Sequence, residues 1–395
     1  MRPDGRGPAP RAVVAAKPGA ADAARPAGGG RDPARAAVLP EVHLVAAARP
    51  NLPKLAALWH ALAQAPPICT PLLVHTGQHH DRAMFGDLIE DLALPDPAIA
   101  LGVSGGTHAE LTGRTMIAAE AAWRARRPAL VVVAGDVDGA LAAGLAARKL
   151  GIRVAHLEAG LRSGEDDMPE EINRRALDAI SDLLWAPDAA TAVRLIAEGY
   201  GGERVRAVGN AMVDSLLRHL PAARARPLPE GLAHGGYGIV TLHRPANVDA
   251  RATLLHLIEA VERAAERLPL VWPLHPRTRA RMEEFGLVPP RRVRMLPPLR
   301  YLDFLALMAG ARLIATDSGG AQEEAAALGL PCLTLRSSTE RPVTLSAGGN
   351  RLVTPADLPS AVLLPPGRAA PIPLWDGQAG ARMRAHLAEV LARCR

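Results

Sequence analysis

Residues 311–341 have the sequence ARLIATDSGGAQEEAAALGLPCLTLRSSTER and contain the signals that decide the fold. ARLIAT (311–316) is a short apolar run of the kind that forms a buried strand. A turn with two glycines leads from it into a helix rich in alanine, glutamate and leucine, and PCLTLR (331–336) is the next strand. A strand, a helix and a second strand in this order predict a βαβ unit of a parallel sheet.

The turn before the helix also has the composition of an anion site. Gly319 and Gly320 have no Cβ, so an anion can approach their backbone N–H groups at the helix N-terminus, which the helix dipole favours. Ser318 adds a hydroxyl donor, and Glu323 and Glu324 lie one turn further on, in reach of ligand hydroxyls. Arg341, after the next strand, would supply a cation. Together these residues indicate a nucleotide-sugar pocket. The alternative is a capped helix with a surface ion pair.

The same alternation of strand and helix patterns extends over residues 41–392. Further strands are expected at residues 42–47, 71–76, 129–135, 152–158, 238–243, 270–275 and 293–298. Helices are expected at residues 52–62, 84–92, 107–126, 141–150, 169–184, 252–268 and 378–392. A stretch rich in Pro, Gly and Ala, residues 221–236, predicts a linker. We therefore predict an α/β protein with two Rossmann-like, doubly wound domains that face each other across a cleft.

Length and charge agree with this division and exclude several classes of protein. The 395 residues exceed the usual size of one domain. Of the net charge of +6, residues 1–38 carry seven basic and three acidic residues, so the remainder is nearly balanced and does not indicate a nucleic-acid partner. Residues 1–40 are expected to be a disordered basic extension, because they lack hydrophobic periodicity. The domains are then residues 41–220 and 221–376, and residues 377–395 form a helix that docks back on the first domain.

Other patterns bear on compartment and cofactors. No uncharged apolar run approaches the roughly 20 residues that span a membrane. The three cysteines, Cys69, Cys332 and Cys394, are far apart in the sequence, so we expect a cytoplasmic protein without disulfides. The first strand is not followed by GxGxxG, which argues against a nicotinamide or flavin cofactor, and neither HExxH nor a Cys/His cluster suggests a metal site. We expect no cofactor.

Charged residues gather at the ends of the expected strands. Arg49 and Lys54 follow the first strand, at a spacing that suits a diphosphate. Asp136 and Glu158 follow two neighbouring strands, and MPEEINR (168–174) adds Glu170 and Arg174. Carboxylates that converge in this way are typical of acid–base catalysis, because they shift each other's pKa values. The alternative is that these acids are helix caps and first-turn residues.

Two histidines in the second half also follow strands. His243 lies in TLHRPAN (241–247) and His275 in PLHPRTR (273–279), and an arginine follows each closely. This arrangement favours a hydrated anionic site over two structural histidines.

Ten motifs, in order, now resemble a known family over residues 42–353. They are ARPN…K, HTGQHHD (75–81), GDVDGALA, HLEAGLRS, MPEEINR, VGN (208–210), TLHRPANVD, LHPRTR, TDSGGAQEEAAALG and TERPV. The chain resembles the UDP-N-acetylglucosamine 2-epimerase family, non-hydrolysing bacterial type. The resemblance implies a glycosyltransferase-B-like arrangement with UDP bound by the second domain. It also implies interconversion of UDP-GlcNAc and UDP-ManNAc by anti-elimination of UDP to 2-acetamidoglucal and re-addition.

The resemblance also implies roles for single residues. The catalytic set would be Asp136, Glu158, Glu170 and His243. The nucleotide sugar would contact Arg49, Lys54, Arg174, His275, Ser318, Gly319, Gly320, Glu324 and Arg341. Gln78 and His79 match positions near a second, regulatory UDP-GlcNAc. A homodimer is expected.

The chain departs from the family pattern at a few positions. Ala246 stands where the family's HRxEN motif has glutamate, and Ser337 and Ser338 replace a more usual acidic or polar pair. Three other readings stay open: a hydrolysing epimerase that releases ManNAc and UDP, a glycosyltransferase of the same architecture, and a UDP-sugar sensor without catalysis.

Overall fold

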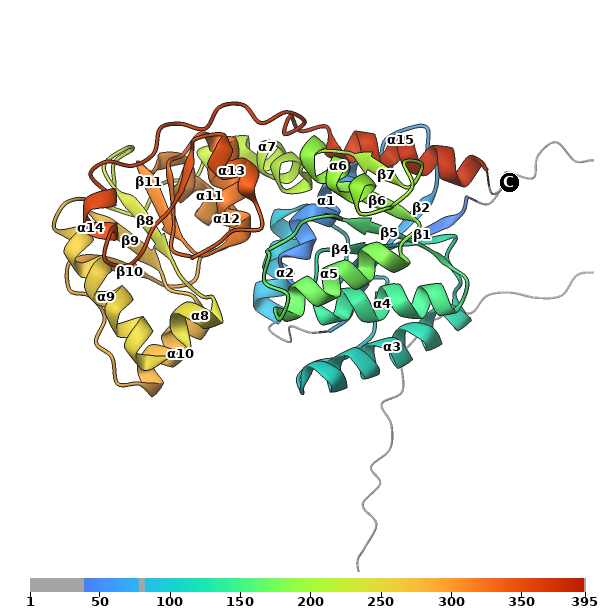
Figure 1. The fold of residues 1–395 in the computed structure, drawn as a ribbon, viewed down its shortest axis with the longest axis horizontal. Helices are drawn as coiled ribbons and strands as arrows, with labels where there is room; N and C mark the ends of the chain where they lie inside the picture. Colours follow the sequence, from blue (N-terminus) through green and yellow to red (C-terminus); the bar gives the residue numbers. More distant parts are fainter. Residues whose placement is uncertain (1–38, 78–81, 394–395) are drawn as a thin grey trace, which may run out of the picture.

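The computed structural model describes residues 39–77 and 82–393, which form two α/β domains (Figure 1). The first domain contains a seven-stranded sheet of order β3-β2-β1-β4-β5-β6-β7, in which every pair of neighbours is parallel. Its strands are β1 (Glu41–Ala46), β2 (Thr70–His75), β3 (Ile99–Ala100), β4 (Leu130–Ala134), β5 (Arg153–Leu157), β6 (Leu183–Ala186) and β7 (Val205–Ala207).

The second domain contains a six-stranded parallel sheet of order β10-β9-β8-β11-β12-β13. Its strands are β8 (Gly238–Thr241), β9 (Leu270–Pro273), β10 (Val293–Leu296), β11 (Leu313–Thr316), β12 (Cys332–Thr334) and β13 (Asn350–Leu352). The prediction of two doubly wound α/β domains is confirmed.

Helices cover both faces of each sheet. Those of the first domain are α1 (Asn51–Leu62), α2 (Arg82–Asp91), α3 (His108–Ala125), α4 (Asp138–Lys149), α5 (Pro169–Ile180), α6 (Ala189–Ala197) and α7 (Ala211–Arg224). The second domain adds α8 (Pro245–Val248), α9 (Arg251–Ala265), α10 (Pro276–Glu284), α11 (Tyr301–Gly310), α12 (Gly319–Leu328), α13 (Pro342–Ser346) and α14 (Leu358–Ala361), and α15 (Ala379–Ala392) ends the described chain. No helix in the described ranges is both long and apolar enough to cross a membrane.

The central strands are buried on both faces, which explains why their sequences are continuously apolar. All five residues of β4 are fully buried, and alternate residues belong to different cores: Val132 packs under α1, and Val133 packs under α3 and α4. The two cores fix the sheet as a rigid base, so the loops at the strand ends are held in defined positions.

Two helices connect the domains. In Figure 1, α7 lies between the two lobes, and the last segment of the chain crosses from the second domain to place α15 on the first. Met383 and Leu387 of α15 are fully buried in the core around α1. Trp185 of β6 donates a hydrogen bond of 3.1 Å from Nε1 to Nδ1 of His386. The C-terminal helix thus contributes to the core of the first domain.

Two predictions about the middle of the chain were wrong. The helix expected at 169–184 ends at Ile180, and the following strand β6, helix α6 and strand β7 were missed. The backbone N–H of Asp182 donates to the Val154 carbonyl (2.8 Å), while its carboxylate accepts from the Val154 N–H (2.8 Å), so the chain is tied to β5 as a strand. Helix periodicity alone did not reveal this long-range pairing.

The predicted linker also begins too early. Helix α7 continues to Arg224 with Pro221 inside it. Leu216, Leu220 and Ala223 bury one face of this helix against α11 of the second domain. Tertiary packing therefore overrides the helix-breaking tendency of proline at this position.

The strand order determines where a ligand can bind. In each sheet the order reverses once, between β1 and β4 in the first and between β8 and β11 in the second. Ligands of doubly wound proteins bind beyond the carboxyl ends of the strands at such a point. The loops after these four strands carry Arg49, Asp136, His243 and Asp317.

Candidate active site

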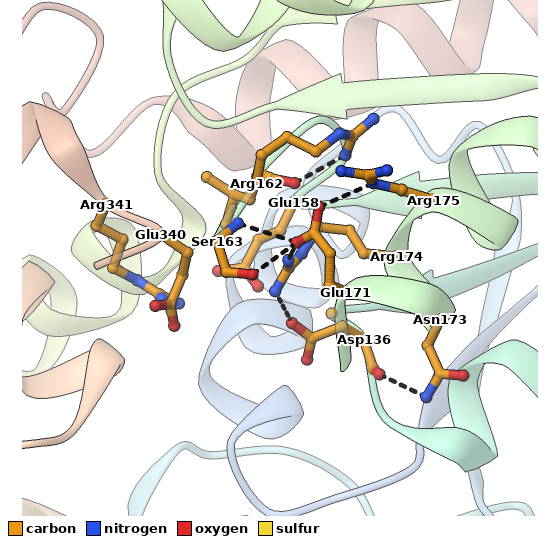
Figure 2. A network of polar contacts seen from close by, with 12 residues as sticks. Asp136, Glu158, Arg162, Ser163, Glu171, Asn173, Arg174, Arg175, Glu340 and Arg341 are labelled. Atoms are coloured by element: carbon orange, nitrogen blue, oxygen red, sulfur yellow. Dashed lines mark hydrogen bonds and ion pairs between the residues drawn. The ribbon is translucent and has the colours of Figure 1, made fainter. Parts of the chain in front are cut away.

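A network of ion pairs forms the first-domain side of the site (Figure 2). Arg174, on α5, contacts both the carboxylate of Asp136, after β4, and that of Glu171. Glu171 also accepts hydrogen bonds from the Ser163 backbone N–H (2.9 Å) and from Arg175 Nε (3.0 Å). Burial alone would raise the pKa of Glu171. The Ser163 N–H, Arg174 and Arg175 together have the larger, opposite effect, so the pKa of Glu171 is lowered. Arg174 is therefore fixed in place by one carboxylate and presents its second amino group to Asp136.

Glu158 has the most unusual environment of the predicted catalytic residues. It follows β5 with φ of 73°, the left-handed conformation that a residue with a side chain adopts only at a cost. Its side chain is buried, and Lys54 of α1 contacts one carboxylate oxygen. The other oxygen, Oε1, has no hydrogen-bond partner among the described residues. A strained, buried carboxylate with an unused oxygen is a group prepared for a ligand or a proton.

The structure distinguishes the two adjacent glutamates of MPEEINR. Glu171 is 1% exposed and belongs to the network, whereas Glu170 is only half-buried. The side chains of these two neighbours leave the first turn of α5 in different directions, which explains the difference. The sequence analysis did not identify Glu171 as a site residue, although the i, i+3 spacing from Glu171 to Arg174 is a recognisable ion-pair pattern.

The second-domain side begins with two stacked histidines. The rings of His243 and His275 lie 5.0 Å apart at 32°, one after β8 and one capping α10. Burial lowers the pKa of His243, although Asp317, 3.3 Å from its Nδ1, opposes this shift. Burial, His243 and Arg49 lower the pKa of His275 to about 4. His275 is thus neutral near pH 7, and Arg49 of the first domain is near enough to influence it.

Asp317 is a site residue that the sequence analysis quoted but did not select. It is fully buried and accepts hydrogen bonds from the backbone N–H groups of His243 (3.0 Å) and Arg244 (2.9 Å) and from Nδ2 of Asn247 (3.0 Å). The carboxylate therefore holds the loop after β8 in place and orients His243. Its position at a strand end, directly before the glycine turn, was the available signal.

Three arginines converge on Glu340 beside the glycine turn. Arg341 Nη1 lies 2.6 Å from the Glu340 carboxylate, Arg336 Nη1 lies 2.7 Å from it and Arg244 Nη2 lies 2.9 Å from it. Burial would raise the pKa of Glu340, but the three arginines hold it far below its usual value. Arg341 makes a second ion pair with Glu323 (2.7 Å). Of these five groups, Arg336 and Glu340 were not predicted from the sequence to lie at the site.

The start of α12 has the predicted geometry. Ser318 caps the helix by accepting a hydrogen bond from the Ala321 N–H, and Gly319 and Gly320 form its first two positions. A Cβ on Gly319 would lie 2.5 Å from Nη1 of Arg341, whereas one on Gly320 would meet only Met212 at 3.4 Å. Arg341 therefore packs directly over the first turn, and Gly319 is required for this close approach.

Glu324 lies deeper than its neighbours in this site. It is 5% exposed and lies beside Tyr301, and burial together with Glu323 raises its pKa to about 7, against a smaller lowering by Tyr301. Tyr301 and Arg49 line a small cavity between the two domains. A partly protonated carboxyl at such a depth suits hydrogen bonds with hydroxyl groups of a ligand.

The two sides face each other closely enough to interact. The charges of Glu158 and Lys54 affect the pKa of Glu323, and Glu158 also affects that of Arg341. Figure 2 shows Glu340 and Arg341 beside the first-domain network. The structure thus brings Glu158 and Lys54 of the first domain close to Arg341 of the second, and Arg49 close to His275, whereas no contact links Glu170 to the second domain among the described residues. Gln78 and His79 lie outside the described residues, and no three metal-ligating side chains in the described ranges could share an ion.

The site can be compared with those of known proteins. The profile of the family described as UDP-N-acetylglucosamine 2-epimerase matches residues 60–363. A protein of Methanocaldococcus jannaschii named UDP-N-acetylglucosamine 2-epimerase is 38% identical over 327 residues, 79% of this chain and 88% of that protein. A Pseudomonas aeruginosa protein named UDP-2,3-diacetamido-2,3-dideoxy-D-glucuronate 2-epimerase is 38% identical over 310 residues, 78% of this chain and 86% of that protein.

A solved structure has the same architecture. The crystal structure of the M. jannaschii UDP-GlcNAc 2-epimerase in complex with UDP-GlcNAc and UDP superposes with a TM-score of 0.82 at 36% identity, and it covers 88% of this chain and 99% of that one. The sequence resemblance and the glycosyltransferase-B-like arrangement are confirmed. This chain belongs to the UDP-N-acetylglucosamine 2-epimerase family.

Proposed function

We propose that this protein interconverts UDP-GlcNAc and UDP-ManNAc by anti-elimination of UDP and re-addition. The observation that carries the proposal is Glu158, strained, buried and with one carboxylate oxygen unused, which faces a cation-rich side of the other domain. A base and a cation site on opposite sides of one sugar are what an elimination of a diphosphate requires.

In the proposed reaction a base removes the C2 proton of the sugar. The electrons of the C2–H bond form the C1–C2 double bond of 2-acetamidoglucal, and those of the C1–O bond leave with UDP. UDP oxygen then attacks C1 again while a proton is delivered to the opposite face of C2. The candidates for the proton transfers are Asp136, Glu158, Glu170 and His243.

The remaining residues would bind the nucleotide sugar. The N–H groups at the start of α12, with Ser318, Gly319 and Gly320, suit the diphosphate. The arginine cluster around Glu340 carries three positive charges against two carboxylates, Glu340 and Glu323, so it has an unbalanced cation beside this helix end. Glu324 suits a ligand hydroxyl. Arg49, Lys54, Arg174 and His275 would complete the contacts from both domains. The elimination and the re-addition transfer only protons and UDP and no hydride, so this route needs no nicotinamide.

One experiment tests the reaction directly. The protein is incubated with UDP-GlcNAc in deuterated water and followed by proton NMR, with and without EDTA. We expect UDP-ManNAc with deuterium at C2 in both samples. Free ManNAc and UDP would identify a hydrolysing epimerase, binding without turnover would identify a sensor, and retention of the C2 proton would contradict the elimination.

A second substrate follows from one relative. The P. aeruginosa protein is as similar to this chain as the M. jannaschii protein, and its name specifies a diacetamido uronate. The same incubation with UDP-2,3-diacetamido-2,3-dideoxy-D-glucuronate separates the two. A kcat/KM higher for the uronate than for UDP-GlcNAc would assign this chain to the second reaction.

A further inference from the structure

A buried histidine lies directly beneath the two carboxylates that follow β4 and β5. His156 is the fourth residue of β5 and is fully buried. One ring nitrogen, Nδ1, lies 2.8 Å from Oδ1 of Asp178, and the other, Nε2, lies 3.0 Å from the carbonyl oxygen of Gly135. Asp178, on α5, is also fully buried. Neither residue takes part in the proposed proton transfers.

Both partners of His156 are hydrogen-bond acceptors. A backbone carbonyl can only accept, so Nε2 must carry a proton. Asp178 already receives hydrogen bonds from Arg162 Nη1 (2.7 Å) and from the Gly160 N–H (3.2 Å), and it is therefore held as a carboxylate. Burial alone would raise the pKa of Asp178. His156 and Arg162 together have the larger, opposite effect, so the pKa of Asp178 is lowered. A carboxylate cannot donate, so Nδ1 must carry a proton as well.

His156 and Asp178 belong to a series of four charged side chains whose charges sum to zero. His156 faces Asp178, Asp178 also faces Arg162, and Arg162 forms an ion pair with Glu198. Two cations and two anions thus alternate in one chain. Tyr200 lies near Asp178 and stacks under Arg204. A doubly protonated His156 is therefore neutralised within this chain of four groups, and Arg204 is a further cation, at the Asp178 backbone carbonyl (3.4 Å). The neighbouring carboxylates meet the usual objection to an imidazolium in a core.

The pair controls the backbone on both sides of the catalytic carboxylates. Gly135 immediately precedes Asp136, and Gly160 comes two residues after Glu158. Gly135, Glu158 and Gly160 all have positive φ, at 70°, 73° and 82°. His156 holds the first of these turns through Nε2, and Asp178 holds the second through the Gly160 N–H. The ion pair of His156 and Asp178 thus links the two turns that orient Asp136 and Glu158.

We propose that His156 is an imidazolium in the folded protein and that, with Asp178, it acts as a positioning pair for both Asp136 and Glu158. The positioning role rests on the proposed function, because it assumes that these carboxylates act on the substrate. The charge of His156 does not, because it follows from the hydrogen bonds alone. The two parts can therefore be tested separately.

The first test measures the protons of the ring. In a ¹⁵N–¹H correlation spectrum of the free enzyme near pH 7.5 we expect both nitrogens of His156 to carry a proton. The signals are assigned by their loss in His156→Gln or, if that variant does not fold, by their shift in Arg162→Lys, which alters the ion pairs with Asp178 and Glu198 but replaces no partner of the His156 ring. A ring with a single proton would overturn the proposal, whether or not the enzyme turns over UDP-GlcNAc.

The second test separates positioning from stability. His156→Asn can keep the donor toward Asp178, and His156→Gln can keep the donor toward Gly135, so each variant breaks one half of the link. We expect kcat to fall by about 100-fold in both, the effect of misplacing a reacting group by about 1 Å, while the KM for UDP-GlcNAc and the Kd of UDP change by less than about threefold.

The control is His43→Gln. His43 is also fully buried in the first sheet, where its Nδ1 accepts a hydrogen bond from Trp123. In the strand register, His43 lies opposite Val131 of β4, whereas His156 lies opposite Val133, two residues closer to the site. We expect His43→Gln to lower the melting temperature while kcat stays within about twofold of wild type. Unchanged kcat in folded His156→Asn and His156→Gln would overturn the positioning role. Loss of turnover in the wild type itself would contradict the proposed function and leave the spectrum as the test of the charge.

Discussion

The two sides of the site use charge in opposite ways. On the first domain, Arg174 bridges Asp136 and Glu171, Arg175 also contacts Glu171, and Lys54 contacts Glu158. Three cations thus bind three carboxylates, and Oε1 of Glu158 has no hydrogen-bond partner among the described residues. On the second domain, three arginines share Glu340. The first arrangement leaves carboxylate oxygens free for proton transfer, and the second leaves cationic groups for an anion. In the proposed reaction, this difference would keep the base and the leaving group on opposite sides of the cleft.

The largest expected effect is on the first-domain side. Glu158→Gln keeps the shape of the side chain but cannot take a proton, so kcat for epimerisation should fall by about 1,000-fold, within the range for loss of an acid–base group. UDP affinity, measured by calorimetric titration, should be unchanged because Glu158 is proposed to act on the sugar, and the proposed diphosphate site at the start of α12 lies on the other domain.

Glu165→Gln is the matched control for this substitution. Glu165 is an exposed glutamate of the same domain, and its replacement should leave kcat within about twofold of wild type. A Glu158→Gln variant with normal kcat would remove Glu158 from the proposed mechanism.

The next effect is on the second-domain side. Arg341→Ala leaves Glu323 and Glu340, both buried, without their shared partner, and removing one member of a buried ion pair costs about 3–5 kcal/mol of unfolding free energy. It should also weaken UDP binding. Denaturant unfolding and calorimetry measure the two effects separately.

Arg124→Ala provides the comparison for the stability loss. Arg124 forms an exposed i, i+4 pair with Glu120, so its removal should cost only about 0.5 kcal/mol. If Arg341→Ala is as stable as Arg124→Ala, the buried pairs described here do not support the second domain. Full UDP affinity in a folded Arg341→Ala variant would remove Arg341 from the binding site.

Arg341 also illustrates what the sequence could and could not predict. The motif TDSGG placed an anion site at the start of a helix, and the structure has that helix end. The ion pairs of Arg341 with Glu323 and Glu340 could not be predicted from the motif, because the three residues meet only when β11, β12 and α12 pack together. The motif was enough to predict an arginine at this site, whereas the ion-pair partners of that arginine depended on the tertiary structure.

The fold shows the same division. Continuous apolar runs such as β4 were recognisable because strands buried on both faces have no polar residues. Strand β6 was missed because its four residues follow a strongly amphipathic helix without a glycine or proline between them. Helix α7 was cut short at Pro221, whose cost is offset by packing against α11. Local signals therefore sufficed for the central strands and failed where long-range packing decided the outcome.

A third prediction concerns the pH dependence of stability. Burial raises the pKa of Glu324 from 4.5 to about 7, so between these values the folded protein binds more protons than the unfolded chain. The contribution of this group is therefore present below pH 4.5 and is lost as pH rises toward 7, by up to about 3 kcal/mol. Glu324→Gln should flatten this part of the profile, and Glu120→Gln, on the exposed face of α3, should not. A profile that Glu324→Gln leaves unchanged would contradict the raised pKa.

The smallest effect lies where the two sides touch at the edge of the cleft. Ser338 Oγ donates a hydrogen bond of 2.6 Å to Glu165 Oε1 of the first domain. The pair is exposed, so Ser338→Ala should change the unfolding free energy by less than about 1 kcal/mol and KM by less than about twofold. Ser338→Asp places two like charges across the cleft and should raise the KM for UDP-GlcNAc by about threefold, the scale of a 0.5–1 kcal/mol repulsion in water.

The double variant Ser338→Asp, Glu165→Gln decides whether this repulsion acts between the domains. With the neutral amide in place of Glu165, an aspartate at position 338 regains a donor, so KM should return to the wild-type value while kcat stays constant throughout. A KM that remains high in the double variant would mean that the aspartate acts on the anionic substrate itself and not on the approach of the domains. Because α7 already packs against α11 of the second domain, such a result would leave domain closure to contacts of that kind, and the contact between Ser338 and Glu165 would be its consequence.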